Sequence, residues 1–543
     1  MVAPIYPYVT PPELAAGGVA RTQVAIVGAG PVGLACAIDL AQHGVDFIII
    51  DDNNTVSAGS RAICWAKRTL EILDRLGCGD QVCERGVSWK VGKVFCGDQL
   101  AYQFDLLPEP GHKRPAFINL QQYLVEEIMV QRLAALGATV RWKNKATAIE
   151  QPADSNSAVL EVDTPDGQYT IEADYVIAAD GARSPLRDAL GLVWKGQVFN
   201  DRFLIADVRM KGDFPSERWF WFDPPFHPGG SVLLHRQADD LWRIDFQLGW
   251  ASDPDEEKKP ERVMPRIRAM LGDGRAFELQ WVSVYTFQCA RLERFVHRRV
   301  IFVGDAAHQV SPFGARGANS GIQDADNLCW KLARVVQGGA PASLLESFDD
   351  ERVQAADENI MNSSRSTDFI TPKSNASRVL REAVLALSQQ HPFARRIVNS
   401  GRLSMPTTHR ESALSTPDRN VFGLGPVPGS PAEDAPLRIQ AKASALLDQL
   451  GGRFDLVAFD DSGETASALR SAVGAEARVH CVSSAAHTAQ QSLQDPDGVT
   501  ARRYGAQPGT VYLFRPDQHV AARWHGPAIG DVRRGLRRAQ GLA

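Results

Sequence analysis

The clearest pattern along the chain is a pair of short apolar runs with a stretch of helical spacing between them. Residues 23–27 and 47–50 form apolar runs, which are typical of strands buried on both faces in a parallel sheet. Over residues 33–43, apolar positions recur three or four residues apart, as on one face of a helix. The pattern predicts a β-α-β unit. Similar runs at 174–179 and 299–303 predict two more buried strands.

Between residues 203 and 288 the pattern changes to aromatic and alternating segments. Period-2 alternation rich in aromatic and branched residues predicts strands of a mostly antiparallel sheet, at 218–222, 231–235, 242–247 and 281–287. Helical spacing is clearest on either side of this region and predicts helices at 62–76, 121–135 and 317–336.

The last quarter of the chain starts a new pattern. Residues 404–436 are rich in Pro, Gly, Ser and Thr, as a linker would be. After them we predict a helix at 439–450, a strand at 454–459 and a hairpin formed by 510–514 and 519–524. This indicates a separate C-terminal domain.

Composition narrows the classes of partner. The chain has 543 residues, a formal net charge of −5, 44% hydrophobic and 23% charged residues. Such a surface gives no reason to expect nucleic acid or a membrane as a partner, and no run approaches the length of a membrane span. The eight cysteines are scattered, which favours a reducing compartment, and we expect a cytoplasmic protein. The spacing of Cys78 and Cys83 resembles a redox pair, but ordinary packing is favoured.

The first motif with chemical content is Gly28-Ala29-Gly30-Pro31-Val32-Gly33, between the first predicted strand and the first predicted helix. Gly28 allows the tight turn, Gly30 lets a pyrophosphate approach the backbone, and Gly33 lets helix and strand pack closely. Asp51, eighteen residues beyond Gly33 at the end of the second strand, is placed to bind a ribose. The motif predicts a dinucleotide site without choosing between NAD and FAD.

Two further motifs lie at the ends of predicted strands. Asp180-Gly181-Ala182-Arg183-Ser184 follows one strand, and Gly304-Asp305-Ala306-Ala307-His308 follows another. After the second comes a glycine-rich loop that opens a helix at Gly317-Ala318-Asn319. Asp305 can accept a hydrogen bond from a ribityl hydroxyl. Free N–H groups at the helix start would stabilise negative charge on the pyrimidine side of a reduced flavin, so these residues favour FAD.

With all three motifs in this order, residues from about 21 to about 420 resemble the single-component FAD-dependent aromatic hydroxylases, the family of para-hydroxybenzoate, phenol and 3-(3-hydroxyphenyl)propionate hydroxylases. The resemblance implies that Asp180 and Gly181 take part in both FAD and NAD(P)H binding. It also implies that Arg61 lies near the flavin phosphates and Gln122 near the FAD, with Gln121 as the alternative if the register is shifted by one.

The chain departs from the family pattern at several positions. Asp51 stands where Glu is commoner, and Arg316 stands where Gln is frequent in the glycine-rich loop. Ile63 occupies a position at which phenol hydroxylase has an Asp that helps to activate the substrate. That base is therefore missing here or is supplied by another residue.

The resemblance implies a reaction in which NADH or NADPH reduces bound FAD, O2 adds to give a C4a-hydroperoxide, and a phenolic or other electron-rich ring is hydroxylated. A general base must reach the substrate hydroxyl. The candidates are Tyr285 and His235 on the antiparallel sheet. Trp219 and Trp221 could wall the ring pocket or pack in a core, and Arg218, Arg236 or Arg243 could hold a substrate carboxylate. His308 is interpreted as structural.

The predicted fold class is α/β: a Rossmann-like FAD-binding domain with an inserted, mostly antiparallel substrate sheet, followed by a thioredoxin-like α/β domain. The expected boundaries are an N-terminal arm at 1–20, the FAD-binding domain at 21–200 and 296–403, the substrate sheet at 201–295, the linker at 404–436 and the thioredoxin-like domain at 437–543. That last domain lacks a Cys-x-x-Cys pair, so packing or oligomerisation is its expected role. We expect a homodimer without a metal site.

Two other functions remain open. The same fold could support a different flavin chemistry, such as epoxidation or another oxygenation of a non-phenolic, polyketide-like substrate, or halogenation. The chain could also be a flavin-bound interaction protein that uses its tail for docking. Analysis of the product separates the other flavin chemistries from aromatic hydroxylation. Slow flavin reduction by both NADH and NADPH in the presence of aromatic compounds would favour the interaction protein.

Overall fold

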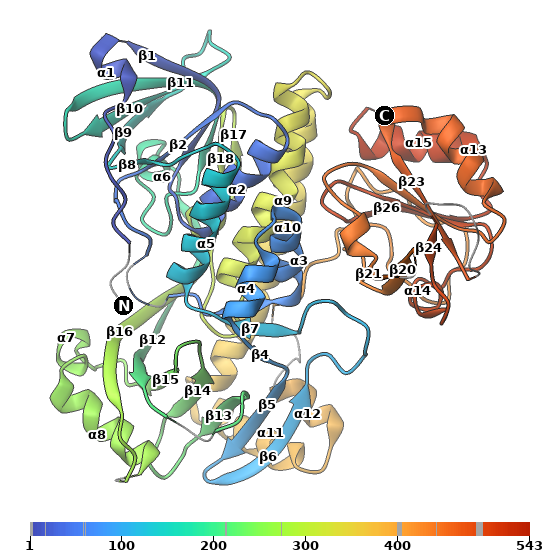
Figure 1. The fold of residues 1–543 in the computed structure, drawn as a ribbon. Coiled ribbons are helices and arrows are strands. Elements are labelled where there is room, and N and C mark those ends of the chain that lie inside the picture. The colour runs from blue at the N-terminus through green and yellow to red at the C-terminus, as the bar shows by residue number, and fades with distance from the viewer. Residues whose placement is uncertain are drawn as a thin grey trace.

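The computed structural model describes residues 4–16, 18–57, 59, 61–211, 214–272, 274–398, 404–440, 442–484 and 492–542. Figure 1 shows an upper layer of strands and long helices, a second sheet below it, and a C-terminal lobe at the side. No helix in these ranges is both long and apolar enough to cross a membrane.

The upper layer is built on an eight-stranded sheet. Its central strands are the predicted buried runs, and β1 pairs in parallel with both β2 and β11. Since parallel neighbours end at the same edge, the residues that follow these strands meet there. The strands are β17 (Val296–His297), β18 (Val300–Phe302), β11 (Gly167–Ala178), β1 (Val19–Val27), β2 (Phe47–Asp51) and β8 (Arg141–Trp142), with β9 (Lys145–Glu150) and β10 (Ala158–Thr164) joined to β11.

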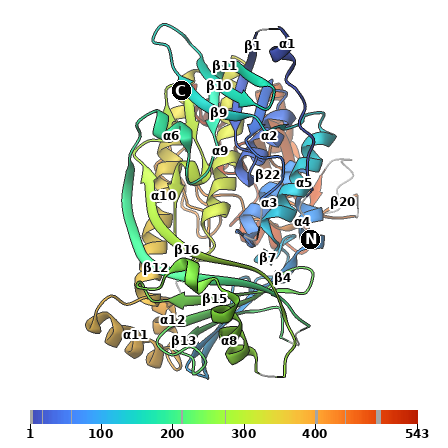
Figure 2. The same cartoon turned by 90° about the vertical axis from the view of Figure 1, so that its left-hand side faces the viewer.

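Long helices pack beside this sheet and share its apolar core. Figures 1 and 2 show α9 running between α2 and α10. The helices of this layer are α1 (Pro12–Ala16), α2 (Pro31–Gln42), α3 (Lys67–Leu76), α4 (Gly79–Arg85), α5 (Gln122–Ala135), α6 (Pro185–Ala189), α9 (Gly317–Val336) and α10 (Glu346–Ile370), with 3-10 turns at η1 (Gly304–Ala306) and η2 (Ala342–Leu345).

The prediction of one helix over 62–76 is wrong at its start. Residues Cys64–Ala66 form strand β3, which pairs with β7 (Phe117–Asn119), and β7 also pairs with β4 (Val87–Trp89). The side chain of Asn319 also accepts a hydrogen bond from the Ala66 N–H at 2.9 Å. Because these backbone groups are used by other segments, the helix begins only at Lys67.

The second sheet has eight strands and is antiparallel except where β13 pairs with β5. It takes β5 and β6 from before residue 201, so two segments far apart in the sequence form one surface. Figure 2 shows it lying beneath the helices, with α8 on its outer side. Its strands are, in order, β19 (His308–Gln309), β16 (Glu278–Leu292), β12 (Trp194–Arg209), β15 (Leu241–Leu248), β14 (Ser231–Arg236), β13 (Arg218–Phe222), β5 (Val91–Cys96) and β6 (Gln99–Asp105).

Helices close both sides of this sheet. Val263 and Ile267 of α8 pack into the apolar core on its outer face, and α10 contributes Ile370 to the core on the other face. The additional helices are α7 (Pro254–Glu257), α8 (Pro260–Leu271), α11 (Asn375–Ser388) and α12 (Pro392–Val398).

The C-terminal lobe contains a seven-stranded sheet with its own apolar core. The strand at 455–459 and the hairpin of β25 with β26 confirm the predicted elements. Its strands are, in order, β21 (Lys442–Ala445), β20 (Pro436–Ile439), β24 (Leu493–Gln494), β23 (Arg478–Ser483), β22 (Asp455–Phe459), β25 (Thr510–Phe514) and β26 (Val520–His525). Its helical segments are η3 (Leu447–Gln449), α13 (Glu464–Val473), η4 (Gly474–Glu476), α14 (Val499–Arg503) and α15 (Ile529–Ala539).

The predicted helix at 439–450 is wrong. The segment contains the end of β20, strand β21 and the turn η3. β20 and β21 pair as a hairpin, and Gln440 between them has φ 49°, a left-handed conformation that suits a turn and does not occur inside a helix. A short apolar spacing fits either element, and the pairing of β21 with β20 makes this segment a strand.

The segment predicted to be a linker packs against the C-terminal lobe. Residues 404–435 contain no helix or strand in the described structure. The Gly429 N–H nevertheless donates to the Val520 carbonyl at 2.7 Å, and Arg523 pairs with Asp418 at 2.8 Å. The segment is therefore a fixed part of the lobe's surface.

A buried network of charges joins the lobe to the helices of the upper layer. Arg515, between β25 and β26, pairs with Glu351 of α10 at 2.6 Å. Glu351 also accepts a hydrogen bond from Lys331 of α9 at 2.9 Å. Arg68 of α3 donates to the Asp517 carbonyl at 2.7 Å. Arg515, Glu351 and Lys331 are all buried, so each charge depends on its partners.

Removing one member of this network is expected to destabilise the whole chain. Arg515→Met leaves Glu351 and Asp517 buried with less compensation, and we expect a loss of about 3–5 kcal/mol in the free energy of unfolding. Denaturant titration measures it. The control, Arg534→Met, removes an exposed ion pair with Asp531 and should change stability by less than about 0.5 kcal/mol. Equal effects of the two variants would contradict a special role for the buried network.

Candidate functional site

The three sequence motifs meet at the carboxyl edge of the upper sheet. Gly28 has φ 103°, and a Cβ on it would lie 2.4 Å from the Ala179 carbonyl oxygen, directly before Asp180. A Cβ on Gly33 would lie 1.9 Å from the Gly28 carbonyl oxygen. Only glycine fits at these two positions, and their contact with Ala179 brings the first and second motifs together.

Val32 joins the third motif to the first. A Cβ on Gly304 would lie 3.0 Å from Val32 Cγ2, and one on Gly321 of α9 would lie 2.6 Å from the same atom. The start of α2, the end of β18 and the first turns of α9 therefore pack around one valine side chain. This contact fixes where the N-terminal ends of α2 and α9 lie relative to each other.

The backbone around the first turn of α2 leaves room for a phosphate group. Nothing lies within 4 Å of a Cβ placed on Gly30, in contrast to the crowded Gly28 and Gly33. The space lies at the N-terminus of α2, where unpaired N–H groups and the helix dipole favour an anion. This arrangement fits a pyrophosphate.

Carboxylates end three of the strands that meet here. Asp51 at the end of β2 accepts hydrogen bonds from the Ala29 N–H at 2.7 Å and the Asn53 N–H at 2.8 Å. Asp180 accepts from the Ser184 hydroxyl at 2.7 Å, while its second oxygen is buried without a partner among the residues that the structure describes. Burial raises the pKa of both carboxyl groups. An unpaired buried oxygen beside the phosphate space is a ready acceptor for a ligand.

Asp305 lies in the turn η1, next to the start of α9, and its side chain is exposed to solvent. A Cβ on Gly317 would lie 3.9 Å from its Oδ1 atom. No side chain caps α9, so the N–H groups of its first turn, which includes Gly317 and Ala318, lack a side-chain partner. An acceptor beside free donors fits the ribityl chain and pyrimidine side of FAD.

Gln122, and not Gln121, faces the loop that carries Arg61. The Gln122 side chain accepts a hydrogen bond from the Ala62 N–H at 3.0 Å and donates to the Ser57 hydroxyl at 3.0 Å. Gln121 is buried and donates to the Ala238 carbonyl. Gln121, the alternative to Gln122, therefore does not reach this loop. Arg61 lies in the loop and is exposed.

The side chain of Asn319 is occupied within the protein. It accepts from the Ala66 N–H at 2.9 Å and the Thr69 hydroxyl at 2.6 Å, and it donates to the Cys64 carbonyl at 2.9 Å. The amide thus ties β3 and α3 to α9. Only the backbone N–H of Asn319 is available to a ligand at the helix start.

His308 also has a structural position. Its Nε2 atom lies 2.7 Å from Asp324, a buried carboxylate of α9 that also accepts the Gly304 N–H at 2.9 Å and pairs with Arg352 at 2.6 Å. This agrees with the interpretation of His308 from the sequence. Asp324 holds the backbone that presents Asp305.

Cys78 and Cys83 are free thiols. Burial raises the pKa of Cys78 to about 12 and also raises that of Cys83. A thiol that stays protonated is a poor nucleophile, so the packing interpretation fits both residues.

The two tryptophans considered as pocket walls lie on the wrong face of the second sheet. Trp219 and Trp221 pack with Trp242 in the apolar core that α8 covers. Strand register places Arg218 opposite His235 and His235 opposite Arg243. Since neighbouring side chains alternate, these three residues share the opposite face.

His235 and Tyr285 both lie on that inner face. Burial lowers the pKa of His235 well below its usual range, and the charges of Arg218 and Arg243 lower it further. Burial raises the pKa of Tyr285, which lies within electrostatic reach of Arg61 and Asp305. His235 is therefore a neutral imidazole, and Tyr285 keeps its proton near neutral pH.

The structure adds one residue that the sequence interpretation missed. Asp245 lies two residues from Arg243 on the inner face of the sheet, forms no hydrogen bond or close ion pair with any described residue, and has a buried Oδ1 atom without a partner. Burial raises its pKa to about 6, although Arg243 and Arg218 oppose the rise. In the sequence, the alternation Arg243-Ile244-Asp245 indicates that Arg243 and Asp245 share one face of a strand, but it does not indicate which face of the sheet is the inner one.

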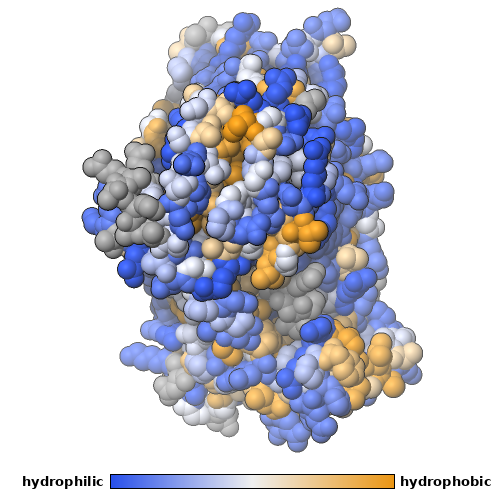
Figure 3. Space-filling model, turned by 90° about the vertical axis from the view of Figure 1, so that its right-hand side faces the viewer, coloured by the Kyte–Doolittle hydropathy of each residue, from blue (hydrophilic) through white to orange (hydrophobic). Residues whose placement is uncertain are grey.

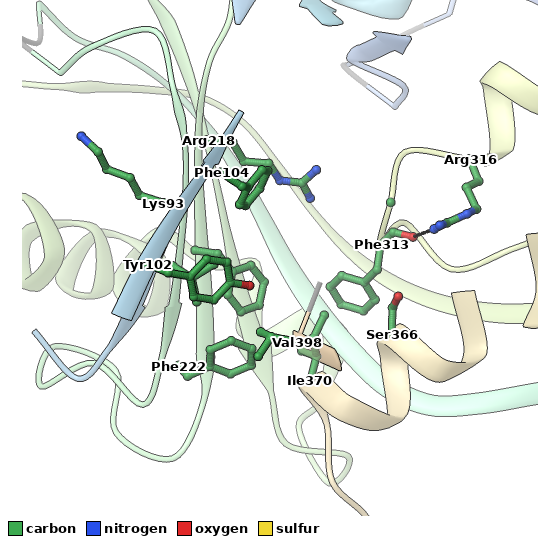
Figure 4. A pocket seen from close by; sticks show the side chains of 13 residues that line it. Lys93, Tyr102, Phe104, Arg218, Phe222, Phe313, Arg316, Ser366, Ile370 and Val398 are labelled. Carbon is green, nitrogen blue, oxygen red and sulfur yellow. Dashed lines mark hydrogen bonds between the residues drawn. The ribbon is translucent and has the colours of Figure 1, made fainter. Parts of the chain in front are cut away.

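A pocket lies between the inner face, α10 and the loop before α9 (Figure 4). Its empty volume is about 620 Å³, with the open mouth included. Aromatic side chains form most of its walls, and Figure 4 shows Tyr102 with its hydroxyl toward the interior and Arg218 above it. The lining residues are Lys93, Val94, Tyr102, Phe104, Arg218, Phe220, Phe222, Phe313, Gly314, Arg316, Ser366, Ile370 and Val398.

The loop Phe313–Arg316 lines this pocket and leads directly into the start of α9. Arg316 directly precedes α9 and donates to the Phe313 carbonyl at 3.2 Å. Gly314 has φ 93°, and a Cβ on it would lie 1.8 Å from Arg316 Nη1. The glycine lets the guanidinium fold back over the loop. A ring bound in the pocket thus lies beside the site suited to the flavin.

Comparison with known proteins agrees with this geometry. The family described as FAD binding domain matches residues 21–363, more than half of the chain, and the chain belongs to that family. The 6-methylpretetramide 4-monooxygenase of Streptomyces rimosus is 30% identical over 523 residues, covering 92% of this chain and 90% of that protein. A 3-(3-hydroxy-phenyl)propionate/3-hydroxycinnamic acid hydroxylase of Burkholderia vietnamiensis is 27% identical, covering 94% and 95%.

A solved structure has the same fold. The flavin-dependent monooxygenase PieE, in complex with FAD and substrate, superimposes with a TM-score of 0.80 at 22% identity, covering 96% of this chain and 99% of that one. The predicted resemblance to the FAD-dependent hydroxylases is confirmed, as is the assignment to the flavin-dependent monooxygenases.

Two glycine substitutions should separate folding from cofactor retention. Gly30→Ala adds a methyl group to open space, so the apoprotein should keep its thermal midpoint while FAD retention falls at least about tenfold, because the pyrophosphate loses its close approach. Gly33→Ala should lower both, because its Cβ meets backbone.

Flavin absorbance after gel filtration and calorimetry of the apoproteins measure the two effects. Gly423→Ala, in open space and exposed, is the control and should change neither. Full FAD retention by Gly30→Ala would refute the assignment of the phosphate space.

Proposed function

We propose that this chain is an NAD(P)H-dependent FAD monooxygenase that hydroxylates a phenolic or other electron-rich aromatic compound with O2. The observation that carries the proposal is the aromatic-walled pocket, which shares the loop Phe313–Arg316 with the start of α9. Relatives named as a pretetramide monooxygenase and a hydroxyphenylpropionate hydroxylase support an aromatic substrate.

In this proposal Gly28, Gly30 and Gly33 admit the pyrophosphate, and Asp51 and Asp305 hold the ribose and ribityl hydroxyls. Arg61, Gln122 and the backbone at Gly317, Ala318 and Asn319 complete the cofactor site. When bound, FAD would accept electrons from NAD(P)H and would activate O2. The protein holds the ring in the pocket and excludes water around it.

Asp180 and Gly181 are proposed to serve the nicotinamide cofactor as well as FAD. The support is the unpaired Asp180 Oδ1 atom and the open space at Gly181, where nothing lies within 4 Å of a Cβ placed on the glycine. Gly181 has φ 79°, so a larger residue would be strained there. The choice between NADH and NADPH is left to a direct rate comparison.

Asp245 is proposed as the acceptor of the proton from the substrate hydroxyl. It faces the inner side of the sheet, its Oδ1 atom has no hydrogen-bond partner among the described residues, and its pKa of about 6 suits a general base near neutral pH. Tyr285, with its proton retained, is proposed to donate a hydrogen bond to the substrate oxygen. His235 is proposed to position the site as a neutral imidazole, because two guanidinium groups oppose its protonation.

The C-terminal lobe is proposed to be a thioredoxin-like module with a structural role. The support is its sheet, with β22 between parallel β23 and antiparallel β25, and the helices α13 and α15 that share one of its apolar cores. Its only cysteine, Cys481, is a free thiol whose pKa is raised by burial, so disulfide exchange is not expected of it.

A homodimer is proposed, with α11 and α12 as the surface. Val379, Leu380, Leu387, Phe393 and Ile397 are exposed on these helices. Figure 3 shows apolar side chains gathered at the lower right of the molecule, where α11 and α12 lie. Exposed apolar groups of this extent are typical of interfaces. Light scattering of the FAD-loaded protein measures its molar mass in solution and so distinguishes a dimer from a monomer.

The proposed reaction makes a direct prediction. Phenols, hydroxybenzoates or hydroxyphenyl acids should accelerate NAD(P)H oxidation by the FAD-loaded enzyme at least about tenfold, with one atom from ¹⁸O₂ in the product. Mass spectrometry of the product provides the readout, and catalase-sensitive peroxide without product is the control for uncoupling. Absence of stimulation by every aromatic compound would contradict the proposal, and an epoxide product would favour the alternative oxygenation.

The role of Asp245 predicts a pH profile. A base must be deprotonated to accept a proton, so kcat/KM should rise with pH through about 6 and level off above it. Asp245→Asn should remove this rising limb and lower kcat at least about 100-fold while FAD retention is unchanged. The exposed Asp255→Asn variant is the control. A rising limb that persists in Asp245→Asn would assign the base to another residue.

A further inference from the structure

The N-terminal arm is a packed element for which the proposed reaction has no use. Its described residues, 4–16, contact strands β8 and β10 of the upper sheet. The Tyr8 hydroxyl donates to the Thr164 hydroxyl of β10 at 3.1 Å, and Glu13 of α1 pairs with Arg141 of β8 at 3.1 Å. Figure 1 shows α1 at the top of the upper layer and the N-terminal end of the chain far below it. The arm therefore runs along this layer and is fixed to it at several points.

The beginning of the arm pairs with the segment that follows Asp51. The Tyr6 N–H donates to the Asn54 carbonyl at 2.8 Å, and the Asn54 side chain donates to the Tyr6 carbonyl at 3.4 Å. Ile5 and Thr55 form an antiparallel bridge. The arm thus binds, as a short strand would, to the chain three and four residues beyond the carboxylate that is proposed to hold the ribose.

The arm also covers the strand beside Asp51. Trp142 of β8 lies opposite Asp51 in the parallel pairing of β2 with β8. The Tyr6 ring stacks on the Trp142 ring, with 4.6 Å between the centroids and 8° between the planes. Trp142 is buried, and Tyr6 packs against the same apolar core. Tyr6 therefore contacts both pieces of chain that flank Asp51.

These two pieces of chain set the position of the Asp51 carboxylate. Its oxygens accept the Ala29 N–H of the first motif and the Asn53 N–H, which directly precedes Asn54. The Asp51 carbonyl accepts the Asn144 N–H, in the turn after β8, at 2.8 Å. A group that binds a ligand must be held to within about 0.5 Å of its productive position. Contacts that fix the neighbours of Asp51 therefore matter for the ligand.

We propose that the N-terminal arm is a strap for the adenosine half of FAD. By pairing with Asn54 and stacking on Trp142, Tyr6 fixes the backbone around Asp51 and so slows dissociation of the cofactor. Tyr6 is a positioning residue in this scheme, since it acts through Asp51. The inference rests on the proposed placement of the ribose at Asp51. None of the described arm residues lines the aromatic pocket, so the effect is confined to the cofactor.

Titration of the full-length apoprotein with FAD, followed by flavin fluorescence, tests the strap. Tyr6→Ala removes the stacked ring and should weaken FAD binding about threefold to tenfold. Removal of residues 2–10 also removes the backbone pairing and should weaken it at least about tenfold. Tyr6→Phe keeps the ring and should stay within about twofold of wild type. The matched control is Val9→Ala, at an exposed position of the same arm, which should behave likewise.

ADP and FMN, each carrying part of FAD, separate a local effect from a general loss of structure. In Tyr6→Ala, ADP should lose the same factor in affinity as FAD, while FMN binding stays within about twofold of wild type. If Tyr6→Ala binds ADP as tightly as wild type does, the proposal is overturned. Equal losses for ADP and FMN would overturn it as well, because the arm would then support the whole fold. Should the truncated chain not fold, the Tyr6 variants decide.

Turnover distinguishes this inference from the proposed function. At saturating FAD, Tyr6→Ala should keep the wild-type kcat, and a lower kcat would contradict an effect confined to the adenosine half. FAD affinity that depends on Tyr6, in an enzyme that oxidises NAD(P)H with no aromatic compound, would refute the proposed function and leave the strap standing. Hydroxylation by an enzyme whose FAD affinity is indifferent to Tyr6 would do the reverse.

Discussion

The site depends on one buried carboxylate, Asp324. It lies on α9 and accepts the Gly304 N–H, the His308 ring N–H and the guanidinium of Arg352. These contacts hold together the end of β18, the strand that follows it and α10. Without these contacts the position of Asp305 relative to the start of α9 would not be fixed, because Asp305 and α9 belong to different elements. These three partners offset the cost of burying the charge.

The cofactor side and the substrate side of the site are built in different ways. On the cofactor side the protein uses backbone: glycines without Cβ atoms, N–H groups at helix starts and carboxylates at strand ends. On the substrate side it uses side chains on one face of a sheet, including Arg218, Asp245 and Tyr285. Backbone geometry is shared by any chain with the same motifs. The side chains of the pocket are free to differ, and they decide which ring is accepted.

The sequence predicts the cofactor side well because its signals are local. A glycine with positive φ or a close backbone neighbour must be glycine, whatever surrounds it, and a short apolar run before it marks a buried strand. Both failed helix predictions fall where strand pairing overrides helical spacing. Residues 64–66 pair with β7, which is distant in the chain, and residues 442–445 pair with the adjacent strand β20 in a hairpin. Apolar spacing alone reports neither pairing.

The sequence by itself determined the family, the binding of FAD and where the buried strands lie along the chain, since each follows from motifs and spacing over a few residues. The tertiary structure alone decided which face of the second sheet is inner. That choice placed Trp219 and Trp221 in a core and put Arg218 and Asp245 on the inner face, where Arg218 lines the pocket. The physical reason is that alternation along a strand gives two faces of equal standing, and only packing against α8 and α10 distinguishes them.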